Sequence, residues 1–152
     1  MRPVAGLKAD ATVTEAQHLM AKAFAAAGID SGLTDARALL CAALRLSRAQ
    51  LLAQSDRMLE PREIAAVLAD EKALAVSRVR DGLVIGADQT LEFEGRLYDK
   101  AHDVAEARAR LTQFRAKPHQ LHAAVSLARG EAVIWRETVT ATLTMRDFSQ
   151  AW

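Results

Sequence analysis

Apolar side chains in the first half of the chain recur at the three-and-four spacing of amphipathic helices. Thr12 and Glu15 have the capping-box spacing, in which each side chain meets a free backbone amide at a helix start. Gly28 suits the C-terminal stop of the same helix. Between them one apolar face is formed by Ala16, Leu19, Met20, Ala23, Phe24 and Ala27. The pattern predicts a first helix between Thr12 and Gly28.

Three more helices are predicted before residue 80. Residues 33–46, LTDARALLCAALRL, form the second, with Thr34 as its expected N-cap. Ser47 is the expected cap of a short third helix over 47–54. Pro61 is well placed in the first turn of a longer helix over 61–79, because proline needs no amide partner there.

The pattern changes after Asp81-Gly82. The segment LVIGA, residues 83–87, is short, apolar and β-branched, which predicts a strand buried on both faces. TLEFEGRLY, residues 90–98, alternates around Glu94-Gly95 and predicts a hairpin.

One more helix and two strands complete the predicted fold. Asp103 and Glu106 have the capping-box spacing at the start of a helix over 103–114. Strands are predicted over 119–128 and 132–145, joined by a turn at residues 129–131. The order is all-helical first and then mixed α/β, which indicates an α+β or α/β fold.

Composition narrows the function classes. The chain has 152 residues, 51% of them hydrophobic and 26% charged, which suits one domain or two small ones that share a core. A net charge of +1 implies neither a nucleic acid nor a membrane partner. The apolar runs are shorter than the roughly 18 residues of a membrane span, and MRPVAGLKAD has no signal-peptide pattern. We therefore expect a cytoplasmic protein, in which the single cysteine, Cys41, is a packed structural thiol.

The polar cluster after the first strand is the candidate site. Asp88, Gln89 and Thr90 follow LVIGA, at the strand end where α/β sheets bind ligands. Asp88 could accept a proton from water or help to hold a divalent cation, and Lys100 could contact a phosphate. Alternatively, Asp88 is a turn residue whose side chain bonds nearby amides. Spacing alone favours the turn.

Other polar residues give weaker indications. Lys72 is a second phosphate contact if it faces the strand end, although helical spacing favours a solvated face. His119 and His122 are three apart on a strand and should point to opposite faces, which makes them poor joint metal ligands. Phe114 and Trp135 are expected in the core.

From about residue 60 the chain resembles the central part of the Maf-type nucleoside triphosphate pyrophosphatases. The resemblance is carried by an ordered series of motifs: EKALAVS, LVIGADQT, GRLYDK, DVAEARARLTQF, HQLHAAVSLARG and ETVTATLTMRDFS. The order is more specific than any one motif, and it reverses the preference for a turn at Asp88. Maf proteins also carry a Ser-x-Ser-Pro-Arg-Arg-like phosphate loop and a C-terminal segment that we do not find here. We therefore expect an incomplete fold of the Maf (anticodon-binding/ITPase-like) type.

The resemblance implies cleavage of the α–β phosphoanhydride of a nucleotide, with release of a nucleoside monophosphate and pyrophosphate. It implies Asp88 as the proton acceptor and a divalent cation, Mg²⁺, on the phosphates, with Asp88 as a possible ligand. Gln89 lies where the family tunes base preference, with Thr90 beside it. Lys72 and Lys100 match two lysines of the family. The resemblance thus implies that Gln89, Thr90, Lys72 and Lys100 bind the substrate.

The first part of the chain resembles a different family. AGIDSGLTDARALLCAALRLSRAQLLAQSDRML is similar to the helical N-terminal domain of the release-factor glutamine methyltransferases of the HemK type, over about residues 14–68. That resemblance implies contact with a release factor. The methyltransferase domain itself, with its Asn-Pro-Pro-Tyr signature, is absent, so methyl transfer is not expected.

We therefore predict a helical segment over 1–68 packed on a small mixed sheet in a Maf-like core over 60–152. The two segments share the helix near 61–79, as a natural fusion or a constructed chimera would. Two functions stay open: a nucleotide pyrophosphatase, active or inactive, and a non-catalytic scaffold or release-factor-binding module. A truncated sheet with unprotected edges also predicts a possible homodimer by strand pairing.

Overall fold

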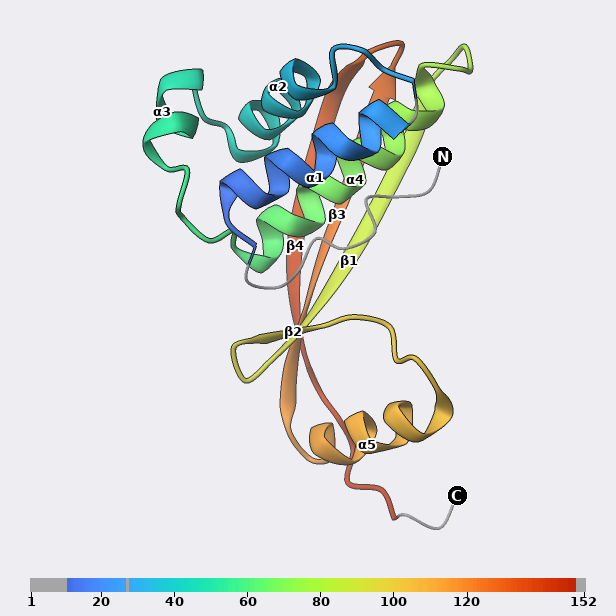
Figure 1. Cartoon of the computed structure of the whole chain (residues 1–152). Coiled ribbons are helices and arrows are strands. Elements are labelled where there is room, and N and C mark those ends of the chain that lie inside the picture. The colour runs from blue at the N-terminus through green and yellow to red at the C-terminus, as the bar shows by residue number, and fades with distance from the viewer. Residues whose placement is uncertain (1–10, 27, 150–152) are drawn as a thin grey trace.

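The computed structural model of the chain describes residues 11–26 and 28–149. Two predictions lie outside the described residues: the place of Ala27 on the apolar face of the first helix, and the absence of a signal peptide in residues 1–10. Four helices come first along the chain: α1 (Val13–Ala26), α2 (Gly32–Leu44), α3 (Arg48–Ala53) and α4 (Pro61–Ser77). The second part consists of β1 (Val84–Phe93), β2 (Arg96–Tyr98), α5 (Val104–Phe114), β3 (Pro118–Arg129) and β4 (Ala132–Thr144). Figure 1 shows α1 to α4 gathered around one half of the sheet, with α5 at its other end. This is an α+β arrangement.

Local capping chemistry sets three of the helix starts. The Thr12 amide donates to Glu15 Oε2 at 2.8 Å, and the Glu15 amide donates to Thr12 Oγ1 at 3.2 Å, which confirms the predicted capping box. Ser47 caps α3 in the same way with Gln50. Pro61 is the first residue of α4, as predicted.

The predicted cap at Thr34 is wrong, because α2 begins two residues earlier, at Gly32. Gly32 lies against α1 so closely that an added Cβ would sit 2.9 Å from the Ala21 carbonyl oxygen. This close packing fixes the first turn of α2 before Thr34. Ser31 precedes the helix, and its hydroxyl donates to Asp35 Oδ2 at 3.0 Å instead of accepting a backbone amide.

The four helices enclose one apolar core that reaches the sheet. Met20 and Phe24 of α1, Leu40 of α2 and Ile64 of α4 are almost fully buried, and Ala128 of β3 belongs to the same cluster. Cys41 is partly buried and packs against this core, as predicted for a structural thiol. Burial of a side chain the size of Leu or Phe stabilises the fold by about 1.5–3 kcal/mol. The helices and the sheet therefore stabilise each other.

The sheet has the order β2-β1-β3-β4, and all its pairs are antiparallel. The expected mixed sheet is therefore antiparallel throughout the described residues. Tight hairpins explain two of the three pairs, β1–β2 and β3–β4, since neighbouring strands joined by a short turn must run in opposite directions, whereas β1 and β3 are connected through β2 and α5. The turns are at Glu94-Gly95 and Gly130-Glu131, where both glycines have positive φ, as predicted from the sequence.

Helix α4 covers only one face of the sheet, so the prediction that residues 83–87 are buried on both faces is wrong. Gly86 faces α4 and is buried, whereas Ile85 on the opposite face is 69% exposed. Trp135, expected in the core, lies in register with Leu127 on the open face and is 48% exposed. The apolar pattern predicted the strand correctly, but nothing in it shows how many faces a helix covers.

An aromatic cluster holds α5 at the far end of the sheet. Phe114 of α5 is buried, as predicted, with its ring 4.5 Å from that of Phe93 and 5.1 Å from that of Tyr98, centroid to centroid. His119 stacks on Phe114 at 5.6 Å. His122 instead bonds Glu92 and Thr140 on the α4 face of the sheet. The two histidines therefore point to opposite faces, as predicted.

Candidate functional site

Asp88 lies within β1 and not at its end. The strand runs on to Phe93, and Asp88 pairs with Ala124 of β3. The predicted position at the C-terminal end of a strand is therefore wrong, because the hairpin extends the strand beyond the polar cluster. Residues of a strand alternate between faces, so Asp88 shares the α4 face with Gly86.

Gly86 brings α4 and β1 close enough for their side chains to meet. A Cβ at Gly86 would lie 2.3 Å from the Ala69 carbonyl oxygen and 2.5 Å from the Ala73 nitrogen, so only glycine fits. This approach places Lys72 of α4 beside Asp88.

Lys72 and Asp88 form an ion pair between Lys72 Nζ and Asp88 Oδ1. The ammonium also lies 3.4 Å from the Ala87 carbonyl oxygen. The Lys72 side chain is 38% exposed and that of Asp88 is 14% exposed. The interpretation of Lys72 as part of a solvated helical face is thus wrong, and its alternative, a lysine that faces the strand, is the observed one.

The neighbouring predicted residues divide between the two faces of the sheet. Thr90 shares the α4 face, and its hydroxyl donates to the Pro61 carbonyl oxygen at 3.1 Å. Gln89 belongs to the opposite face and is exposed. Asp88 and Gln89 therefore do not point into one cluster, although they are adjacent in the sequence.

The structure does not join Lys100 to the pair. The β1–β2 ladder ends at Leu91 and Tyr98, and Lys100 follows in an exposed loop. The adjacent Asp99 carbonyl accepts a hydrogen bond from Arg110, which ties the loop to α5. Within residues 28–149 no hydrogen bond or ion pair links Lys100 to Asp88.

A buried ionic cluster beside α4 escaped the sequence analysis. Arg136 of β4 binds Asp70 of α4 with both ends of its guanidinium, and the Nε–Oδ1 distance is 2.8 Å. Ser126 donates to Asp70 Oδ1 at 2.5 Å, and Arg136 Nη1 donates to the Ala42 carbonyl at 3.0 Å. One signal was present: Asp70 lies among alanines on the buried face of a predicted helix, a place where a charge needs a partner. The partner, 66 residues away, could not be named from spacing.

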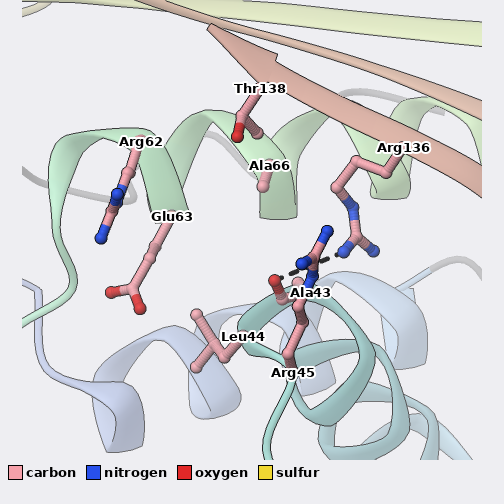
Figure 2. Close-up of a pocket in the computed structure, with 8 residues that line it drawn as sticks. All are labelled: Ala43, Leu44, Arg45, Arg62, Glu63, Ala66, Arg136 and Thr138. Carbon is pink, nitrogen blue, oxygen red and sulfur yellow. Dashed lines mark hydrogen bonds between the residues drawn. The ribbon is translucent and has the colours of Figure 1, made fainter. Parts of the chain in front are cut away.

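A cavity of about 300 Å³ lies between the end of α2, the start of α4 and β4. Figure 2 shows three arginines around it: Arg45 just after α2, Arg62 of α4 and Arg136 of β4. Glu63 and Thr138 also line it.

The described part of the chain contains no cluster of three or more His, Cys, Asp or Glu side chains placed to hold a metal ion. None of its helices is long and apolar enough to cross a membrane.

The geometry thus defines an α+β protein with a lysine–carboxylate pair where one helix meets the first strand of an antiparallel sheet. Residues 36–152 match the family model described as Maf-like protein, and the chain belongs to this family. The matched part includes the whole sheet, α4 and the Lys72–Asp88 pair. It also begins upstream of residue 60, where the sequence resemblance was taken to start.

Curated relatives are similar over the same region. The chain is 52% identical over 106 residues to a nucleoside triphosphate pyrophosphatase from Caulobacter vibrioides, covering 70% of this chain and 52% of the relative. It is 44% identical over 88 residues to a 7-methyl-GTP pyrophosphatase from Brucella suis, covering 57% and 44%. A 7-methyl-GTP pyrophosphatase from Rhizobium meliloti is 36% identical over 126 residues, covering 76% and 63%. The chain spans about half the length of the first two of these relatives.

Proposed function

We propose that the protein is a Maf-like nucleoside triphosphate pyrophosphatase. The observation that carries the proposal is the ion pair between Lys72 and Asp88, which places a partly exposed cation beside a carboxylate on the α4 face of the sheet. Both residues lie within the region matched to the family. The names of the relatives, nucleoside triphosphate pyrophosphatase and 7-methyl-GTP pyrophosphatase, support a nucleotide as substrate.

The proposed reaction is hydrolysis of the α–β phosphoanhydride. The oxygen of a water molecule forms a bond to the α-phosphorus, and the bond from that phosphorus to the bridging oxygen breaks. Asp88 accepts the proton of the attacking water, and pyrophosphate leaves with the electron pair of the broken bond. The products are a nucleoside monophosphate and pyrophosphate.

Lys72 has two roles in this proposal. In the free protein it pairs with Asp88. With substrate present its flexible ammonium turns to a phosphate oxygen, which leaves Asp88 free to take the proton. We expect electrostatic stabilisation of the phosphate charge to contribute more to the rate than the proton transfer to Asp88.

The remaining predicted residues have less direct roles. Thr90 holds β1 to the start of α4 through its hydrogen bond to Pro61. This bond fixes the position of Asp88 along the axis of α4. Lys100 is exposed in its loop and is free to contact a phosphate tail. Gln89 can meet the base only if the substrate passes around the edge of β1, since it belongs to the opposite face.

A divalent cation suits the donor set at Asp88. Mg²⁺ commonly binds through one or two carboxylates together with water and substrate phosphates, so one carboxylate is enough when the phosphates are present. Asp88 is the residue that would contribute to its coordination, and the cation would neutralise phosphate charge.

The test is release of pyrophosphate from a panel of nucleotides that includes 7-methyl-GTP, with Mg²⁺ and the purified protein. We expect release by the wild type, and we expect Lys72→Met to lower the rate while it leaves the fold intact. Lys117→Met is the matched control, because Lys117 is a lysine in a salt bridge with Glu94 away from Asp88. Equal rates for Lys72→Met and the wild type would contradict the assigned role.

One observation favours the alternative of a non-catalytic scaffold: Lys72 already satisfies Asp88, as in a structural ion pair. In that case Asp88→Asn alters only the free energy of unfolding and no nucleotide is cleaved. Contact of α1 to α3 with a release factor belongs to the same alternative. Retention of release factor on the immobilised protein would support it, and absence of retention would remove it.

The free strand edges support a homodimer as the assembly. The β4 strand pairs on one side with β3, and most of its residues are exposed. β1 pairs with β2 only from Leu91 to Phe93, so its first part also has one unpaired edge among the described residues. Unprotected edges favour pairing with another strand. Light scattering at two protein concentrations distinguishes a dimer from a monomer.

A further inference from the structure

The cavity of Figure 2 is lined from α4 by Arg62, Glu63 and Ala66, and neither Lys72 nor Asp88 is among its lining residues. Asp88 pairs with Ala124, and Ala124 pairs with Thr138 at the cavity, so two strand spacings, about 10 Å, separate Asp88 from Thr138. Small side chains of α4 pack on Ala124 and fill the space between: Ala65, Ala66 and Ala69. The cavity is therefore a separate site.

The acidic residue of the cavity is already neutralised. Glu63 accepts two hydrogen bonds from Arg57, at 2.8 and 3.0 Å. The hydrogen bond to Glu63 raises the pKa of Arg57 above its usual value, although burial acts in the opposite direction. Glu63 thus adds little negative charge to the space.

Arg136 is neutralised as well. Its guanidinium is paired with the buried carboxylate of Asp70 and donates to the carbonyl oxygens of Ala42 and Ala43. It forms a rigid wall of the cavity and adds little net charge.

Arg45 supplies the excess positive charge, whereas Arg62 is paired with Glu60 but keeps donors available. The Arg45 side chain has no hydrogen bond or ion pair with any residue that the structure describes, and it extends toward Arg136 in Figure 2. Arg62 donates from Nε to Glu60 at 2.8 Å, which leaves both of its terminal amino groups available. Arg45 follows α2 and Arg62 belongs to α4, and both line the same space.

The backbone at Arg45 is a second, independent observation. Arg45 follows α2 in the left-handed conformation, with φ +55°, and the amides of Arg45 and Leu46 close the helix end on Ala42 and Cys41. Glycine is the usual residue at such a position because it has no Cβ to strain. An arginine there is less favourable for the backbone than glycine, which is consistent with a use for its side chain.

We propose that this cavity binds a small phosphorylated anion, whose phosphoryl oxygens are held by Arg45 and Arg62. Arginine forms paired hydrogen bonds with phosphate, and the hydroxyl of Thr138 lies in the same cavity as a further donor. The volume of about 300 Å³ is at the lower end for small-molecule sites, which suits pyrophosphate or a phosphate monoester. The site shares no residue with the proposed hydrolytic centre and goes beyond the proposed function.

The experiment is calorimetric titration of the whole chain with inorganic pyrophosphate, without Mg²⁺, at low and high KCl. We expect binding that weakens with salt, and an affinity lowered about tenfold by Arg45→Gly or Arg62→Gln, since each removes a charge-assisted contact. Arg80→Gln is the matched control, because Arg80 is exposed and does not line the cavity. Arg45→Gly should also raise the melting temperature, so its loss of binding cannot come from misfolding.

Lys72→Met distinguishes the two sites. If the cavity binds the probe, Lys72→Met retains the tight binding and Arg45→Gly loses it. The proposal is overturned if the wild type shows no binding, or if Arg45→Gly and Arg62→Gln bind as the wild type does. Loss of binding in Lys72→Met alone would also overturn it and would place the pyrophosphate at Asp88.

Discussion

Gly86 is the residue on which the candidate site depends most. Its missing side chain lets the backbone of α4 approach β1, and this approach brings Lys72 to Asp88. The role of Gly86 is therefore one of space, since none of its backbone angles requires glycine. A Gly-Ala pair before an aspartate gives no sign of this in the sequence, because the helix that needs the space is a separate element.

We expect Gly86→Ala to destabilise the protein by about 1–3 kcal/mol, because the new methyl group overlaps the backbone of α4 at Ala69 and Ala73. It should also separate Lys72 from Asp88 and lower any activity. The free energy of unfolding in urea measures the first effect. Ala87→Val is the control, since Ala87 is an exposed neighbour on the open face. A Gly86→Ala protein as stable as the wild type would show that α4 does not need this contact.

The buried ion pair of Asp70 with Arg136 determines how much a substitution at Asp70 destabilises the protein. Asp70→Ala leaves the Arg136 guanidinium buried without its carboxylate, and breaking one side of a buried ion pair costs about 3–5 kcal/mol. Removal of both partners, Asp70→Leu with Arg136→Met, should cost less than the single change. Urea denaturation of the single and double variants measures this. A double variant less stable than Asp70→Ala would contradict the interpretation.

At the scale of elements, local signals in the sequence located the helices and hairpins well. Caps at Thr12 and Ser47 and the turn at Glu94-Gly95 depend on neighbouring residues, so spacing is enough to find them. Predictions that depend on a distant element were wrong, as for Thr34, where packing on α1 moves the helix start. The burial of Ile85 failed for the same reason, since the coverage of a sheet face is a tertiary property.

Helix α5 offers a prediction about pH. Glu106 accepts a hydrogen bond from the His102 amide at 2.7 Å, which lowers the pKa of its carboxyl below the usual 4.5, and Arg110 acts in the same direction. Because the pKa of Glu106 is lower in the folded state, the helix start is stabilised at pH values above the pKa of the unfolded chain. This stability is lost as the pH falls below 4.5 and through the folded pKa.

Amide exchange at His102, followed by NMR as the pH falls, measures this loss. Protection should decrease in the wild type over that window, and Glu106→Gln should abolish the titration of this step. If His102 protection is the same above and below the titration of Glu106, the bond does not hold the helix start.

On the scale of the whole molecule, helices and sheet form one structure, and the match to the Maf-like family model extends from residue 36 across both. The core includes Phe24 of α1 together with Ala128 of β3, and Arg136 ties β4 to the end of α2. The sequence indicated the order of the parts and the motifs of the Maf region. It could not show these contacts, because they join residues about 100 positions apart.

Phe24→Ala therefore tests cooperation between the parts. We expect a loss of about 3–5 kcal/mol, as for other buried aromatic side chains, and one transition seen equally by helix and sheet probes. Far-UV circular dichroism reports the helices, and the fluorescence of Trp135 in a Trp152→Phe background reports the sheet. Two separate transitions would mean that the helical segment and the sheet fold independently.

The central claim is that Asp88 accepts the proton of an attacking water beside Lys72. The most direct test is the initial rate of pyrophosphate release, with Mg²⁺ and the best nucleotide of the panel, for the wild type and for Asp88→Asn. The change keeps the size of the side chain and removes its ability to accept the proton, so we predict a rate lowered by about 10²–10⁴-fold in a protein that remains folded. A folded Asp88→Asn protein that releases pyrophosphate as fast as the wild type would contradict the account.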